Sequence, residues 1–112
     1  MTEITPESIM AAVKQAKPYM LVILKKGPRY AETQDIHMQH LAHIFAMRAA
    51  GQQLITLPVM DPSSEYVGVG VFAVATKEEA IALTEADPAI KAGRLTYEIV
   101  SCMGLPADGL PG

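Results

Sequence analysis

The chain has 112 residues, of which 50% are apolar and 19% are charged, and its formal net charge at pH 7 is -3. This length and composition are typical of one globular domain with a single core. No extended run of Lys and Arg is present, so we expect no nucleic-acid partner. The longest apolar run, residues 19–24, is far shorter than the roughly 20 residues that span a bilayer. Because the N-terminus also lacks the residue order of a secretory signal, we expect a cytoplasmic protein with no membrane association.

The first predicted element is a short helix in the N-terminal segment. Thr5 has the chemistry of an N-cap, Pro6 suits the first helical position, and Glu7 places an acid in the first turn. The helical propensity continues to about Ala16 and stops before the Lys-Pro pair that follows. Because the more strongly periodic segments all come later, we interpret residues 1–18 as a helical extension of the main domain.

A strand, a long helix and a second strand are predicted next. Residues 19–25 carry apolar side chains at both alternating sets of positions, which indicates a buried strand. The breaker KKGPRY separates this strand from a helix predicted from Thr33 or Gln34 to Ala50. The glycine after that helix stands in the C-cap position. The second strand is expected over residues 53–59, followed by the polar loop MDPSSEY.

The C-terminal half predicts a third strand, a second helix and a fourth strand. Residues 67–75 are rich in valine and form the third strand. The residues TKEE from Thr76 match a capping box, so the second helix begins there. It is expected to end near Ala86, because the Asp-Pro pair that follows disfavours helical geometry. Residues 95–100 alternate in polarity and form the last strand, whereas residues 104–112 are rich in Gly and Pro and are expected to be irregular.

Without the N-terminal extension, the elements follow the order β-α-β-β-α-β, which is the ferredoxin-like order. This order predicts an α+β domain over residues 19–103, with an antiparallel four-stranded sheet and its helices on one face. The first and third strands are apolar on both faces, so the second face of the sheet also needs a cover. A second copy of the chain, packed sheet to sheet around an enclosed space, would provide it. We therefore predict a homodimer.

Residues 35–45, DIHMQHLAHIF, place all three histidines of the chain on the predicted long helix. At about 100° per residue, His40 lies inside the apolar arc of this helix, which extends to Phe45. His43 lies at the edge of the polar side, and His37 lies in the first turn. Two neighbouring histidines could reach one cation, but all three on a single ion would be strained, and neither HExxH nor a Cys/His framework is present. We predict no metal site and no cofactor.

An imidazole among isoleucines must find a hydrogen-bond partner. His40 could be a core histidine bonded to a backbone carbonyl, or it could pair with an acid. Asp87, in the segment DPAIKAG between the second helix and the last strand, is the most suggestive acid, although Asp before Pro is also a common helix-ending turn. A His-Asp pair at the rim of a cavity would set the tautomer of the histidine and make it a general acid or base near neutral pH.

Two further sets of residues are candidates for substrate binding. Gly68 and Gly70 point to the same face of the third strand, where missing side chains leave room for a ligand or for close packing. Lys25 and Arg29 follow the first strand together with another lysine. They could attract an anionic ligand, or they could belong to a solvated loop.

Five segments of the chain resemble the YCII-related (YciI-like) family of small dimeric α+β barrel proteins. The segments are YMLVILKKG, HMQHLAHIFAMRAAGQQL, the second strand with its Pro58, GVGVFAVATKEEAIAL and DPAIKAGRLTYEIV, and the resemblance covers about Tyr19 to Met103. The resemblance implies that the predicted homodimer is a dimeric α+β barrel. It also implies an active-site pair formed by the histidine of an HL motif and the aspartate of a DP motif, here His40 and Asp87. Family members often have a glycine where this chain has Leu57, which would narrow or reshape the cavity.

The residues and the resemblance together favour a cofactor-independent lyase or isomerase. Some family members resemble lyases or dehydrohalogenases of aromatic degradation, and the barrel is similar to that of muconolactone isomerases. In this hypothesis His40, oriented by Asp87, transfers a proton on a small organic substrate. The alternative is a non-catalytic dimeric protein that binds a small molecule or serves as an accessory protein. A weaker third hypothesis makes His40 and one neighbouring histidine a metal site.

Overall fold

The computed structural model describes residues 3–112, and the predicted α+β, ferredoxin-like class is confirmed. The elements in chain order, with η for single 3₁₀ turns, are α1 (Pro6–Val13), β1 (Lys17–Lys26), η1 (Tyr30–Glu32), η2 (Gln34–Ile36), α2 (His37–Ala49), β2 (Gln53–Pro58), β3 (Tyr66–Phe72), α3 (Lys77–Glu85), α4 (Pro88–Lys91) and β4 (Leu95–Gly104). Across the described part of the chain, no helix is long and apolar enough to span a membrane.

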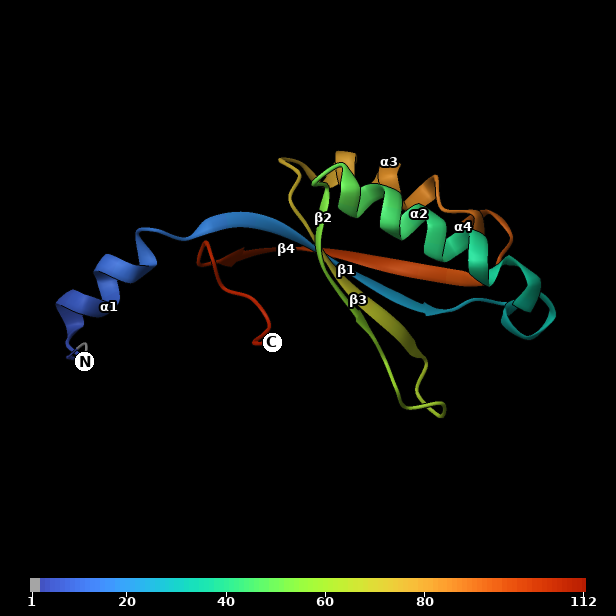
Figure 1. Cartoon of the computed structure of the whole chain (residues 1–112), viewed down its shortest axis with the longest axis horizontal. Helices are drawn as coiled ribbons and strands as arrows, with labels where there is room; N and C mark the ends of the chain where they lie inside the picture. Colours follow the sequence, from blue (N-terminus) through green and yellow to red (C-terminus); the bar gives the residue numbers. More distant parts are fainter. Residues whose placement is uncertain (1–2) are drawn as a thin grey trace.

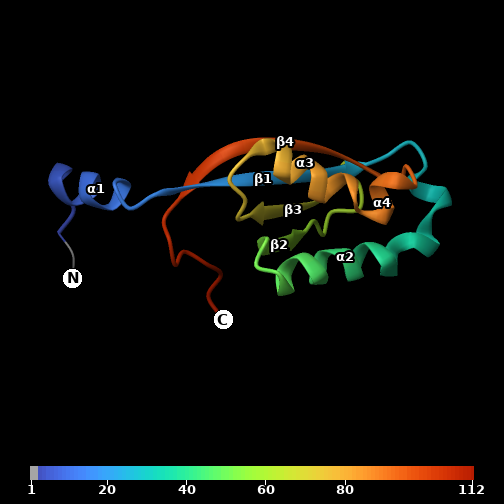
Figure 2. The same cartoon turned by 90° about the horizontal axis from the view of Figure 1, so that it is seen from above.

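The four strands form one antiparallel sheet in the order β2-β3-β1-β4. Helices α2, α3 and α4 lie over one face of this sheet, as the two-layer prediction required (Figure 1 and Figure 2). Helix α1 lies beyond the end of the sheet and contains no buried residue. The sheet therefore has one face covered by helices and a second face, here named the open face, that none of the described helices covers.

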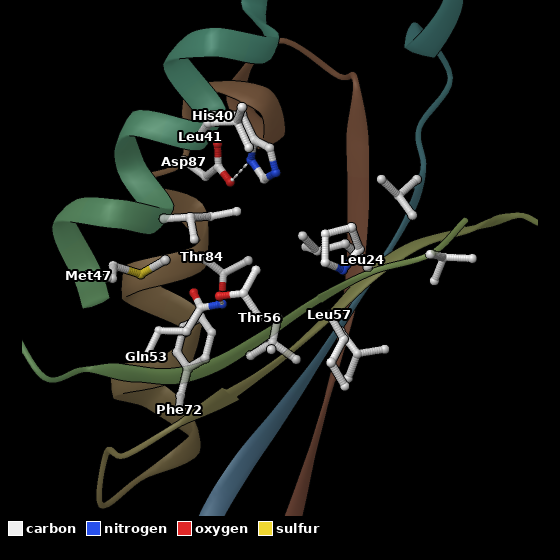
Figure 3. A pocket seen from close by; sticks show the side chains of 18 of the residues that line it. Leu24, His40, Leu41, Met47, Gln53, Thr56, Leu57, Phe72, Thr84 and Asp87 are labelled. Carbon is white, nitrogen blue, oxygen red and sulfur yellow. Dashed lines mark hydrogen bonds and ion pairs between the residues drawn. The ribbon is translucent and has the colours of Figure 1, made fainter. Parts of the chain in front are cut away.

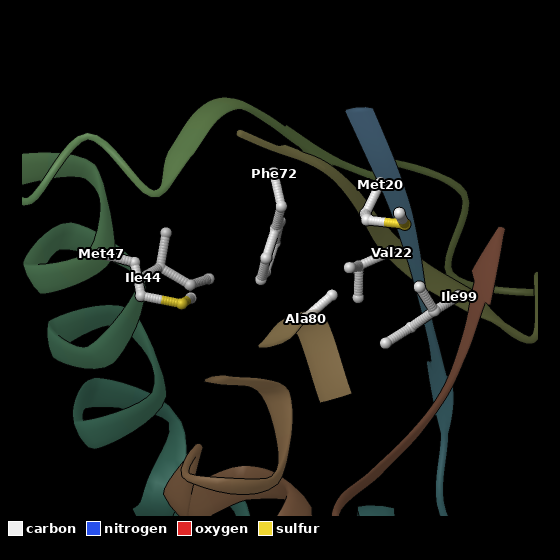
Figure 4. Packing of buried hydrophobic residues seen from close by; sticks show 7 residues of the cluster. All are labelled: Met20, Val22, Ile44, Met47, Phe72, Ala80 and Ile99. Atoms are coloured by element: carbon white, nitrogen blue, oxygen red, sulfur yellow. The ribbon is translucent and has the colours of Figure 1, made fainter. Parts of the chain in front are cut away.

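The core fills the space between the sheet and helices α2 and α3 (Figure 4). Its buried members are Met20, Val22, Ile44, Met47, Phe72, Ala80 and Ile99. Side chains alternate between the two faces of a strand, so Leu21 and Ile23 of β1 point to the open face. Their cross-strand neighbours there are Val69, Val71 and Val100. The open face is thus mainly aliphatic, as the sequence predicted.

The observed strands differ in length from the predicted ones. Strand β1 starts two residues earlier than expected and β4 runs to Gly104, because these two strands pair continuously from Lys17↔Gly104 to Lys26↔Leu95. Backbone pairing extends both strands past the point where the apolar pattern ends. Strand β3 stops at Phe72, three residues earlier than predicted, and residues 105–112 form no helix or strand.

The long helix begins later than predicted, at His37, and two 3₁₀ turns precede it. Thr33 does not cap the helix, because its hydroxyl donates to the carbonyl of Arg29 instead. Gly51 follows the helix with φ 73°, the left-handed conformation that suits glycine at a helix end. The apolar arc is narrower than the helical projection indicated, since Phe45 is 63% exposed.

Candidate active site

His40 lies on the inner side of α2, and its side chain is directed toward α4 (Figure 3). The residue is only 5% exposed. Its Nδ1 atom lies 2.6 Å from Oδ2 of Asp87, a residue 47 positions further along the chain. Helices α2 and α4 pack against each other and thereby bring the two side chains together. The structure thus gives His40 a carboxylate partner rather than a backbone carbonyl.

Asp87 is held by the helix that it caps. It is the N-cap of α4, its Oδ1 atom accepts a hydrogen bond of 2.9 Å from the Ala89 backbone N–H, and Pro88 occupies the first helical position. The Asp-Pro turn that follows α3 therefore also starts α4. Asp87 is both a residue of a helix-ending turn and the partner of His40. With Oδ1 bound to the backbone and Oδ2 bound to His40, the 3% exposed carboxylate has a fixed orientation.

This arrangement determines which nitrogen of His40 is available. A carboxylate only accepts hydrogen bonds, so Nδ1 carries the proton that the pair shares with Asp87. The Nε2 atom has no hydrogen-bond partner among residues 3–112. Every fully buried side-chain nitrogen or oxygen in that range does have a partner, so Nε2 is not fully buried. The Nε2 atom is therefore open to the adjoining cavity.

A cavity of about 300 Å³ separates the His40–Asp87 pair from the β2 and β3 strands (Figure 3). Its wall is mainly apolar and includes Ile44 and Phe72. Apart from the pair, its polar lining comes from Tyr30, His37, Gln53, Thr56 and Thr84. Such a small, largely apolar space with few polar groups is typical of a site for a small organic molecule.

The four proposed substrate-binding residues fall into two groups. Gly68 and Gly70 line the cavity. Lys25 and Arg29 do not line it. The Lys25 ammonium contacts Glu98 at 2.9 Å on the open face, and this carboxylate raises the pKa of Lys25. Arg29 is exposed and contacts Glu32 at 3.4 Å.

The other two histidines occupy different environments. His37 is exposed, lines the cavity, and has its ring centre 6.1 Å from that of His40. His43, expected at the edge of the polar side, is half-buried, and its Nε2 atom lies 2.8 Å from the Leu83 carbonyl oxygen. Within residues 3–112, no three side chains of His, Cys, Asp or Glu are grouped closely enough to hold a metal ion.

Two lining residues, Gln53 and Thr84, were not identified from the sequence. Gln53 opens β2, but the strand has an irregularity between Gln53 and Ile55 that breaks the two-residue alternation. Simple alternation therefore could not place Gln53 and Thr56 on the same side. Thr84 lies on α3 with its hydroxyl bonded to the Ala80 carbonyl, and nothing in its local sequence distinguishes it from a packing residue.

The fold and the site together define a ferredoxin-like α+β protein with a buried His-Asp pair beside a small cavity. No protein-family model and no curated protein matches the chain by sequence. Among solved structures, the chain is similar to the 5-chloro-2-hydroxyhydroquinone dehydrochlorinase TftG from Burkholderia phenoliruptrix AC1100, in complex with 2,5-dihydroxybenzoquinone. The TM-score is 0.57 at 17% sequence identity, covering 72% of this chain and 90% of TftG. At this identity the likeness shows the fold.

Proposed function

We propose that the chain is a cofactor-independent lyase or isomerase in which His40 transfers a proton. The observation that carries this proposal is the 2.6 Å contact between His40 and Asp87 at the wall of the cavity. A histidine with one nitrogen bonded to a carboxylate and the other facing a binding site has the geometry of a general base. The pair is 5% and 3% exposed, so little solvent competes for the proton.

In the proposed reaction, Nε2 of His40 accepts a proton from a carbon or oxygen of the substrate. Asp87 remains a carboxylate and stabilises the imidazolium that forms. In an elimination, the electrons of the broken bond to hydrogen form a new π bond, and the leaving group departs with the electrons of its own bond. In an isomerisation, the imidazolium returns the proton to a different atom. Neither outcome requires an oxidant or a reductant.

The fold and the size of the cavity support a single-ring substrate. TftG, which has the same fold, is described as a dehydrochlorinase and was solved with a dihydroxybenzoquinone. A cavity of about 150 Å³ suffices for benzene, and the cavity beside His40 measures about 300 Å³. One ring with a few substituents therefore fits this space.

The proposal includes a homodimer formed through the open face. Leu57 and Val100 are 40% and 48% exposed on the edge strands of this face, and the central strands present Leu21, Ile23 and Val71 between them. An aliphatic face of this kind is typical of an interface between two protein chains.

The direct test offers the protein a panel of chlorinated and unchlorinated hydroquinones, including 5-chloro-2-hydroxyhydroquinone, in D₂O. Chloride release reports elimination, and incorporation of deuterium followed by NMR reports reversible proton transfer. The key variant is His40→Asn, because the Asn amide can still donate to Asp87 but cannot accept a proton. We expect its rate to fall by about 10²- to 10⁴-fold, the usual contribution of a general base.

His43→Gln is the matched control, because His43 contacts a backbone carbonyl and does not line the cavity. It is expected to keep the wild-type rate. A His40→Asn variant that releases chloride as fast as the wild type would refute the proposed mechanism. Probes that stabilise the wild type against heating but undergo no exchange or elimination would favour the alternative, a non-catalytic small-molecule-binding protein.

A further inference from the structure

Gln53 lies across the cavity from the His40–Asp87 pair, beside Phe72 and Thr56 (Figure 3). It is only 5% exposed. A primary amide carries two donors and one strong acceptor, so its burial is unfavourable unless these groups are bonded. The partners of Gln53 therefore show what the amide can still bind.

The orientation of the Gln53 amide follows from its neighbours. Its Nε2 atom lies 2.8 Å from Thr56 Oγ1 and 3.3 Å from the Ile55 carbonyl oxygen. A carbonyl oxygen can only accept, so the amino group and not the amide oxygen must face it. Arg48 also donates to Thr56 Oγ1, at 3.1 Å. The Thr56 oxygen thus accepts from two donors, which agrees with the same orientation.

The amide oxygen is left as a free acceptor. Gln53 Oε1 has no hydrogen-bond partner among residues 3–112. Every fully buried side-chain oxygen in that range does have a partner, so Gln53 Oε1 is not fully buried. The Oε1 atom must therefore retain contact with open space. Gln53 lines the cavity that His40 also lines, so this oxygen is available to a molecule bound there.

The backbone opposite Gln53 leaves room for this arrangement. A Cβ atom at Gly70 would come within 2.8 Å of Gln53 Nε2 and 3.1 Å of a Phe72 ring carbon. At Gly68, on the same face of β3, the nearest atom would be the Leu57 carbonyl oxygen at 3.4 Å, an ordinary contact. Glycine at position 70 is thus required for the amide to keep its place.

We propose that Gln53 is a specificity-determining residue that selects ligands carrying an O–H or N–H donor. The Oε1 atom accepts a hydrogen bond from one substituent of a single-ring ligand, while the ring lies against the apolar wall between Gln53 and His40. The proposed role of Gln53 defines the substrate class of the site as single rings that carry a donor. It rests on the proposed function only in assuming that His40 acts on the same molecule. Rings without a donor leave the buried acceptor unsatisfied and are discriminated against.

The test uses three probes of similar shape with decreasing numbers of donors: hydroquinone, 4-methoxyphenol and 1,4-dimethoxybenzene. Dissociation constants are measured by NMR titration for the wild type, Gln53→Met and Gln39→Met. Methionine matches glutamine in length but supplies neither donor nor amide oxygen, and Gln39 is an exposed residue of α2. The wild type and Gln39→Met should bind hydroquinone roughly threefold to tenfold more tightly than 1,4-dimethoxybenzene. Gln53→Met should lose most of this preference, and the remainder comes from Nε2 of His40, the other free acceptor in the cavity.

A Gln53→Met variant whose preference is as large as that of the wild type overturns the proposal, and so does a wild type that binds none of the three probes. Thermal melting shows whether Gln53→Met folds. If it does not, the side-chain amide signal of Gln53 in the wild type gives the answer. This signal should shift with hydroquinone more than with 1,4-dimethoxybenzene, and equal shifts overturn the proposal.

The two proposals can fail separately. His40→Asn should still prefer hydroquinone, because Gln53 Oε1 remains in place and the measurement involves binding without turnover. A protein that shows the preference but no proton transfer therefore refutes only the general-base mechanism. Conversely, proton transfer with no donor preference refutes only the role of Gln53.

Discussion

The two faces of the sheet use the same four strands but present very different chemistry. The helix-covered face carries Gln53, Thr56, Gly68 and Gly70 along β2 and β3, next to the cavity. The open face carries aliphatic side chains at the intervening positions, of which Leu21 at the centre of the sheet is typical. Strand alternation keeps the two sets apart, because neighbouring residues point in opposite directions.

This difference shows how a small domain can place ligand binding on one face of its sheet and association with a second chain on the other. Polar groups and missing side chains on the helix-covered face leave a hollow in which two buried polar residues, His40 and Gln53, keep one free atom each. On the open face, among the described residues, the aliphatic surface is interrupted by the ion pair between Lys25 and Glu98. If the contrast is functional, then substitutions on the two faces must have different consequences.

The largest expected effect follows from Asp87→Asn on the helix-covered side. The Ala89 N–H can bond only to an oxygen, so the Asn amide must turn its amino group toward His40. Nδ1 then has to accept, the proton moves to Nε2, and the free base is lost. We expect turnover of a reactive hydroquinone probe to fall by about 10²- to 10⁴-fold. Thermal stability should change little, because Asn is as good an N-cap as Asp.

Turnover is measured by chloride release and stability by the circular dichroism melting curve. Asp35→Asn, at an exposed acid that precedes α2, is the control for removal of one carboxylate and should behave as the wild type. An Asp87→Asn variant with an unchanged rate would show that the carboxylate does not orient the base.

The next largest effect is expected from Leu21→Lys on the open face. In the proposed homodimer, Leu21 lies at the centre of the interface, so each lysine would be buried without a partner. Such a charge costs about 3 kcal/mol or more, which raises the dimer dissociation constant more than 100-fold. Light scattering during gel filtration, over a range of concentrations, measures the dissociation.

Met38→Lys introduces the same charge on the outer side of α2, where Met38 is 71% exposed. It should leave the oligomeric state unchanged. A wild type that is monomeric at all concentrations, or a Leu21→Lys variant that dimerises normally, would refute the use of the open face.

The order of the elements was predictable because it depends on local patterns. The continuous apolar run of β1, the valine-rich β3 and the Thr76 cap each specify one element from a few residues. The Thr76 hydroxyl accepts from the Glu79 N–H as predicted. The strand ends were not predictable in the same way. Residues 101–104 belong to β4 because they pair with residues 17–20 of β1, and local sequence does not encode that long-range pairing.

The geometry of the candidate site was predictable to a similar extent. The position of His40 inside an apolar arc indicated that it needed a partner. Asp87 was indicated by its place between the second helix and the last strand, and the resemblance to a known family pointed to the same residue. The chain brings these two side chains together. Gln53 could not be found, because its orientation depends on a strand irregularity and on space left by a glycine of the neighbouring strand. Nor could sequence show that Lys25 points to the open face, since its cross-strand register becomes defined only when the sheet forms.

A smaller effect should distinguish the two glycines of the helix-covered face. Gly70→Ala forces the Gln53 amide or the Phe72 ring to move, and such overpacking costs about 1–3 kcal/mol. Gly68→Ala makes only ordinary contacts and should be neutral or stabilise by up to about 1 kcal/mol, because alanine loses less backbone entropy on folding. Urea denaturation measures both variants. Equal effects at the two positions would mean that the space at Gly70 is not reserved for the amide.

The smallest expected effect concerns the alkaline stability of the helix-covered face. Burial raises the pKa of Tyr97 above its ordinary value of 10.0, and the nearby Glu85 carboxylate raises it further. The unfolded chain therefore releases this proton at a lower pH than the folded chain does. The stabilising contribution is complete below pH 10.0 and is lost as the pH rises through the higher pKa of the folded state.

Tyr97→Phe should remove this contribution, so its free energy of unfolding should fall less steeply than that of the wild type above pH 10.0. Urea denaturation on both sides of this pH measures the difference. The control is Tyr66→Phe, which removes an exposed phenol from β3 and leaves the loss due to Tyr97 in place. Tyr97 packs against the core beneath the helices. A smaller loss of stability with rising pH in Tyr97→Phe would show that a phenolate is unfavourable on this face. If the free energy of unfolding depends on pH in the same way in Tyr97→Phe and the wild type, this part of the contrast between the two faces is wrong. A phenolate would then be as stable beneath the helices as in water.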